Sequence, residues 1–120
     1  MDLENEEKPI IAIDFDDTII DDKGEFLPYA KEVLLELQKR EYVLVLNTLR
    51  DIRFDHNKYS QYLVPAMDFL NAHGLIFLTP RDFPNSYKIP ADIFIDDANF
   101  GGFPGWEKIA DYFEIKLGEK

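Results

Sequence analysis

Short apolar runs recur along this chain, and each ends in polar or turn-forming residues. Runs of this kind are typical of strands buried in the middle of a parallel sheet. The four runs that we predict to be strands are Ile10–Ile13, Val43–Leu46, Leu75–Leu78 and Ile93–Ile95. In segments between these runs, apolar residues recur three or four positions apart.

In three of the intervening segments, apolar residues recur at helical spacing. The first predicted helix contains Ala30, Val33, Leu34 and Leu37, with Lys39 and Arg40 in its last turn. The second contains Leu63, Ala66, Met67 and Leu70, with Pro65 in or near its first turn and Gly74 at its end. The third covers about residues 105–113. Strands that alternate with helices predict an α/β fold with right-handed crossovers and a mostly parallel sheet.

The remaining segments are predicted to be loops around one domain. Residues 1–8 are expected to be frayed, Ile20–Pro28 to form a turn or short flap, and residues 49–58 to form a polar loop. With 120 residues the chain can bury a real core, but it leaves no room for a second domain.

Carboxylates gather directly after the first and the last predicted strands. Asp14, Asp16 and Asp17 follow the first strand, and Asp96 and Asp97 follow the last. Residues two apart on an extended segment face the same side, so Asp14 and Asp16 are expected to point together. Ligands of open α/β sheets bind at the carboxyl ends of the strands, so this edge is the predicted site.

Several carboxylates at one edge of a sheet repel one another. Two like charges about 5 Å apart cost about 3 kcal/mol at an effective dielectric near 20. A divalent cation removes this repulsion, and oxygen ligands without His or Cys favour Mg²⁺. Thr48 follows the second strand, and Lys88 precedes the fourth. A metal ion together with Lys88 would let a chain of net charge −11 admit a phosphate.

The ordered segments IIAIDFDDT, VLVLNT, Lys88 and IFIDD resemble the haloacid-dehalogenase-like (HAD) hydrolases. The stretches LNTLR and DIFIDDANFGG look like a small capless subgroup from bacteria or phages. The resemblance implies a Rossmann-like three-layer sandwich without a cap domain. It also implies an Mg²⁺-dependent phosphatase that forms an aspartyl-phosphate intermediate.

The resemblance implies a role for each matching residue. Asp14 would be the nucleophile, and Asp16 the general acid and then the general base. Asp14, the Asp16 backbone carbonyl and Asp96 would hold Mg²⁺, with Asp97 in support. Thr48 and Lys88 would bind the phosphoryl group, and Thr18 would shape the loop.

The chain departs from the family pattern in two respects. Asp17 stands where the family often has Gly, and no segment is long enough to form a cap. Caps commonly supply specificity, so the substrate stays open, and a second subunit could act as a lid. The residues whose substrate contacts stay open are Asn47, Arg50, Arg53, Arg81 and the loop Phe100–Trp106, with Arg50 preferred as a phosphate ligand.

Charge and composition exclude several partners. The net charge of −11 argues against nucleic acids and anionic membranes. No apolar stretch approaches the ~18 residues that span a bilayer, and the acidic N-terminus does not look like a signal peptide. The absence of cysteine fits a cytoplasmic protein.

Three other functions compete with the phosphatase. A dehalogenase is disfavoured because a departing halide needs no proton, which Asp16 is placed to supply. A phospho-accepting receiver domain is disfavoured because its acceptor Asp ends the middle strand, where this chain has Asn47 and Thr48; Asp51 would be its alternative acceptor. A non-catalytic module that binds Mg²⁺ or phosphate is the third alternative.

Overall fold

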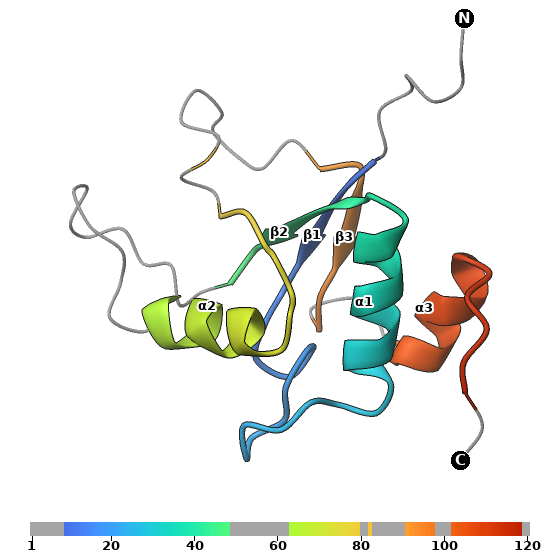
Figure 1. Cartoon of the computed structure of the whole chain (residues 1–120). Helices are drawn as coiled ribbons and strands as arrows, with labels where there is room; N and C mark the ends of the chain where they lie inside the picture. The colour runs from blue at the N-terminus through green and yellow to red at the C-terminus, as the bar shows by residue number, and fades with distance from the viewer. Residues whose placement is uncertain (1–8, 49–62, 80–81, 83–90, 98–101, 119–120) are drawn as a thin grey trace, which may run out of the picture.

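The predicted alternation of strands and helices is present in the computed structural model of the chain (Figure 1). The structure describes residues 9–48, 63–79, 82, 91–97 and 102–118. In these ranges the elements are β1 (Ile10–Ile13), α1 (Ala30–Lys39), β2 (Val43–Leu46), α2 (Leu63–Ala72), β3 (Ile93–Ile95) and α3 (Trp106–Tyr112). The protein is a small α/β structure.

The three strands form a parallel sheet in the order β2-β1-β3. β1 is central, and Ile13 is in register with Leu46 of β2 and Ile95 of β3. The carboxyl ends of all three strands therefore lie at one edge of the sheet, as the sequence predicted.

Alternation along β1 directs successive side chains to opposite faces of the sheet. Ile11 and Ile13 are fully buried in the main core cluster, to which α1, α2 and α3 all contribute apolar side chains. Ala12 lies on the other face in a small separate cluster with Val45. The three described helices thus share one face of the sheet, and α1 and α3 lie side by side on it (Figure 1).

The first helix forms where its apolar spacing predicted it. Its buried residues are Ala30, Val33, Leu34 and Leu37. Arg40, just after the helix, pairs with Glu36 at 2.9 Å and donates hydrogen bonds to the carbonyls of Phe113 and Glu114. These bonds join the end of α1 to the end of α3.

The second helix also follows its prediction. Pro65 is its third residue, where a missing N–H breaks no intrahelical bond. Gly74 has a φ of 79°, the left-handed conformation in which many helices end. The last helix is one residue shorter at each end than predicted, because Gly105 and Phe113 are its caps.

The prediction of a strand over Leu75–Leu78 is wrong. Only Leu78 pairs with β2, through an isolated parallel bridge to Val45. The Leu75 amide donates to the carbonyl of Leu70, and the Ile76 amide to the side chain of Gln38. These two amides therefore donate to groups of α2 and α1, and a continuous ladder of hydrogen bonds with β2 does not form.

The predicted turn after the acidic segment is present. Ile20 forms an antiparallel bridge with Phe26, and the Asp21 carboxylate accepts the amides of Lys23 and Glu25. These two bonds lower the pKa of Asp21. The predictions for residues 1–8 and 49–58 lie outside the described residues. Among the described helices, none has the length and apolar character needed to cross a membrane.

Candidate functional site at the carboxyl edge of the sheet

The hydrogen-bond ladder of the sheet continues one residue beyond the strands. The Asp14 amide donates to the Ile95 carbonyl at 2.9 Å, and the Asn47 amide donates to the Ile13 carbonyl at 2.8 Å. Asp14 follows Ile13 and Asp96 follows Ile95, and these two isoleucines are paired in register. Asp14, Asn47 and Asp96 therefore start from the same edge of the sheet.

Asp14 is half-buried and lies among other carboxylates. The pKa of Asp14 is raised from 3.8 to about 6, and burial is the largest cause. The hydrogen bond that its Oδ1 accepts from the Phe15 amide, 2.8 Å long, opposes this rise. A hydrogen bond with the Asp97 side chain and the negative charges of Asp97 and Asp16 also contribute to the rise. Two of the carboxylates that the sequence groups with Asp14, those of Asp97 and Asp16, thus lie near it.

The turn that carries Asp16 is built on one buried residue. Phe15 is 1% exposed and packs edge-on against Phe69 of α2. Its carbonyl accepts the amides of Thr18, Ile19 and Ile20 at 3.3, 2.8 and 3.2 Å. Phe15 therefore points into the core, between the two half-buried acids Asp14 and Asp16.

Asp17 occupies the position where the resemblance leads one to expect Gly. Its φ is 63°, in the left-handed region, and its side chain is exposed. Glycine adopts this conformation without strain, and Asp does so more readily than most other residues. The backbone conformation at Asp17 is thus one that either Asp or Gly can adopt.

Thr18 connects this turn to α3. The Thr18 carbonyl accepts a hydrogen bond from the Trp106 indole Nε1 at 2.6 Å, and both residues are buried. The Thr18 hydroxyl is buried too, and it has no hydrogen-bond partner in the described part of the chain. The backbone carbonyl of Thr18 therefore links the loop to α3. A role of the Thr18 side chain in shaping the loop stays a prediction.

The flap after the turn packs against α2. The ring of Phe26 lies 4.9 Å from the rings of Phe69 and His73, and the His73 Nδ1 is 3.2 Å from the Lys31 amine. These aromatic contacts cannot be predicted from residue spacing, since Phe26 and Phe69 belong to separate elements.

Some of the other predicted site residues lie within the described residues, and the rest lie outside them. Thr48 follows β2 and is half-buried, as is Asp96 after β3. Asp97 is exposed, yet it contacts Asp14. Outside the described residues lie Lys88, Arg50, Arg53, Arg81, Phe100 and Gly101.

The carboxylates near Asp14 supply oxygen atoms, the ligand type that hard cations prefer. No group of three or more His, Cys, Asp or Glu side chains that could hold a metal ion is present among the residues that the structure covers. Mg²⁺ is usually bound by one or two carboxylates, and water and phosphate oxygens complete its shell. Asp14, its neighbour Asp97 and the adjacent Asp16 are donors of this type.

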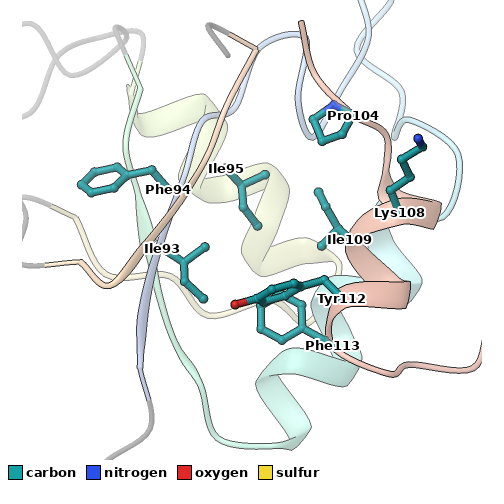
Figure 2. A pocket seen from close by; sticks show the side chains of 8 residues that line it. All are labelled: Ile93, Phe94, Ile95, Pro104, Lys108, Ile109, Tyr112 and Phe113. Carbon is teal, nitrogen blue, oxygen red and sulfur yellow. The ribbon is translucent and has the colours of Figure 1, made fainter. Parts of the chain in front are cut away.

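The pocket drawn in Figure 2 is chemically different from this edge. It has a volume of about 280 Å³ and lies between β3 and α3. Ile93, Ile95 and Ile109 point into it, whereas Phe94 points away (Figure 2). Lys108 is the charged residue in its lining, and Pro104, from the loop Phe100–Trp106, also contributes to it.

A second pocket has a volume of about 300 Å³. It is lined by the end of the flap and the start of α3, including Leu27, Tyr29, Phe103 and Trp106. Trp106 is thus both a wall of this pocket and the donor to Thr18. Residue spacing places Trp106 only at the end of the loop Phe100–Trp106 and does not predict this bond.

Fold and site define a small α/β protein with an acidic carboxyl edge. The chain matches no protein-family model and no curated protein. It is similar to the solved structure of a conserved protein coded by a locus of Bacteroides thetaiotaomicron. The two share 32% sequence identity over 89% of this chain and 90% of that one, with a TM-score of 0.73. The chain belongs to the same family as this conserved protein.

Proposed function

We propose that the protein is an Mg²⁺-dependent phosphomonoester hydrolase of the HAD type. The observation that supports this most strongly is the meeting of Asp14, Asp16 and Asp97 at the carboxyl edge of a parallel sheet. That edge is where α/β enzymes bind ligands. The residues also match, in order, the motifs that the sequence shares with HAD hydrolases.

Asp14 is the proposed nucleophile. One carboxylate oxygen attacks phosphorus, the leaving oxygen departs from the opposite side, and an acyl phosphate forms on Asp14. The Phe15 amide holds Oδ1 and so limits rotation of the carboxylate. Attack requires the ionised form, which burial and the neighbouring acids disfavour. Bound Mg²⁺ would supply the positive charge that favours ionisation.

Asp16 is the proposed general acid and base. It gives a proton to the leaving oxygen, and the carboxylate then takes a proton from the water that hydrolyses the acyl phosphate. The tight turn on the Phe15 carbonyl sets its backbone beside Asp14. A proton donor at this position is the feature that favours ester hydrolysis over dehalogenation.

The metal ligands in this proposal are Asp14, the backbone carbonyl of Asp16, and Asp96. Asp97 supports them, and its contact with Asp14 makes its carboxylate a further candidate ligand. Thr48 would donate its hydroxyl to the phosphoryl oxygens, and Lys88 and Arg50 would neutralise their charge.

We also propose that the fold is a Rossmann-like three-layer sandwich without a cap. Ala12 and Val45 are fully buried, although the three described helices contribute to the cluster on the other face of the sheet. Burial of both faces is what a parallel sheet in a three-layer sandwich requires.

The first experiment measures hydrolysis of p-nitrophenyl phosphate with Mg²⁺ and with EDTA. We expect Mg²⁺-dependent turnover, and a loss of about a thousandfold or more in Asp14→Asn, because the amide cannot form the acyl phosphate. Asp111→Asn, an exposed acid of α3, is the matched control and should keep full activity. Full activity of Asp14→Asn, or turnover in EDTA, would rule out the mechanism.

Two outcomes would favour the competing functions. Calorimetric Mg²⁺ binding without turnover of sugar phosphates, nucleotides, phospholipid head groups or phosphopeptides would indicate a binding module. A stable phosphoprotein labelled on Asp51, and not on Asp14, would indicate a receiver domain.

A further inference from the structure

Trp106 makes a long-range contact with the backbone of the acidic turn. It is the first residue of α3, and its indole N–H reaches a carbonyl 88 positions earlier in the chain, that of Thr18, at 2.6 Å. Both residues are almost completely buried. A buried carbonyl needs a hydrogen-bond partner, and here the indole is that partner.

Several other backbone groups of the turn bond to one another. The amides of Thr18, Ile19 and Ile20 all point to the Phe15 carbonyl, and the Asp17 amide donates to the Ile20 carbonyl. Asp16 forms a bridge with Ile20. The position of Asp16 therefore depends on the shape of this turn, and the turn is tied to α3 through the Thr18 carbonyl.

The indole is held in a fixed orientation. Phe103 packs against it in an edge-to-face arrangement at 5.6 Å, and the rest of the ring is buried in the main core cluster. The N–H is thus presented to Thr18 by a side chain that has little freedom to turn away.

We propose that Trp106 is a positioning residue for the reaction at Asp14 and Asp16. Its indole N–H fixes the Thr18 carbonyl and thereby the turn on which the general acid is carried. This inference rests on the proposed hydrolase function. It predicts that removing the N–H alone, with the ring left in place, slows the chemical step and leaves substrate binding largely intact.

The chain contains a single tryptophan, so the N–H can be removed without any other change. Production in a tryptophan auxotroph with β-(3-benzothienyl)alanine replaces the indole nitrogen by sulfur at position 106 only. The matched control is the protein with 5-fluorotryptophan, which keeps the N–H. Hydrolysis of p-nitrophenyl phosphate gives kcat and KM, and hydrogen–deuterium exchange reports on the amides of Ile19 and Ile20.

We expect kcat to fall about tenfold in the benzothienyl protein, with KM changed by less than about twofold. We also expect the amides of Ile19 and Ile20 to exchange faster. The fluorotryptophan protein should match the natural one in each measurement. Ile109→Val, a core change in the same helix, should lower the melting temperature without lowering kcat.

Three results would overturn the inference. They are an unchanged kcat in the benzothienyl protein, an unchanged exchange of the Ile19 and Ile20 amides, and an equal fall of kcat in Ile109→Val. A natural protein without phosphatase activity would instead refute the proposed function. Exchange at Ile19 and Ile20 would then still test whether the indole holds the turn.

Discussion

Strand β1 and the turn that follows it are neighbours in the chain, but they are stabilised in different ways. β1 is hydrogen-bonded to strands on both sides, and Ile11 and Ile13 are fully buried. In the turn from Asp14 to Ile20, three backbone amides donate to the single carbonyl of Phe15. Asp17 in this turn has a φ of 63°, in the left-handed region. It also brings carboxylates together at Asp14.

This difference shows how the molecule can sustain an unfavourable group of charges. The apolar strand supplies a rigid platform, since burial of aliphatic side chains is strongly stabilising. The turn is then fixed from two sides, by Phe15 in the core and by Trp106 from α3. The local arrangement that weakens the protein is the arrangement that the proposed chemistry needs.

The largest expected effect is on the strand. Ile13→Ala should lower the free energy of unfolding by about 3 kcal/mol, because it leaves a cavity in the main core cluster. Urea unfolding followed by Trp106 fluorescence measures this. Ile10→Ala is the matched control at the half-buried end of β1, and it should cost about 1 kcal/mol. Equal losses would show that the two ends of β1 are equally important.

An intermediate effect is expected from the metal ion at the turn. With a dissociation constant of about 1 mM, Mg²⁺ at 10 mM should stabilise the protein by about 1.4 kcal/mol. Thermal unfolding in MgCl₂ is compared with unfolding in NaCl of the same ionic strength, because salt alone screens the net charge of −11. Asp14→Asn should lose the Mg²⁺-specific part. If NaCl stabilises as much as MgCl₂, the carboxylates do not hold this ion.

The smallest effect is a pH dependence of stability that originates at Asp14. The pKa of Asp14 is about 6 in the folded protein, whereas the ordinary value for an aspartate is 3.8. The folded state therefore binds the proton of Asp14 more tightly than the unfolded state does. The contribution of this proton to the stability of the folded protein is complete below about pH 4 and is lost as the pH rises through about 6. Asp14→Asn should therefore be more stable than the natural protein at pH 8 by roughly 1 kcal/mol, after allowance for solvent screening of a half-buried group.

Melting temperatures at pH 4 and pH 8 measure this difference without added metal ions. The two proteins should converge at the lower pH. Asp111→Asn controls for the loss of one negative charge elsewhere on the surface, and its difference from the natural protein should be smaller at pH 8. A variant Asp14→Asn that is less stable than the natural protein at pH 8 would contradict the assignment of the repulsion to Asp14.

Local patterns in the sequence predicted most elements of the described fold. The apolar runs of β1, β2 and β3 and the helical spacing of α1 and α2 correspond closely to the observed elements. These patterns suffice because burial of one helix face or of a central strand follows from residue spacing alone. The parallel direction of the strands follows from the helices that connect them.

The segment Leu75–Leu78 shows where such patterns fail. Its apolar residues are typical of a strand, and Leu75 and Phe77 are indeed buried. The amides of Leu75 and Ile76, however, donate to the Leu70 carbonyl and to the side chain of Gln38, and Leu78 alone bonds to β2. Apolar spacing predicts burial, but the partners of backbone hydrogen bonds depend on how the helices pack.

Part of the candidate site was likewise predictable from the sequence, and part depends on tertiary packing. The amino-acid sequence by itself determined that carboxylates follow β1 and β3, and parallel strands then bring Asp14 and Asp96 to one edge. Only the tertiary structure decided that Asp97 contacts Asp14 and that Trp106 binds the Thr18 carbonyl. The positions of the strands follow from short-range periodicity, because burial of an apolar run depends on neighbouring residues alone. The contacts of Asp97 and Trp106, in contrast, join groups more than 80 residues apart, whose distance is set by the order of the strands and the packing of the whole core.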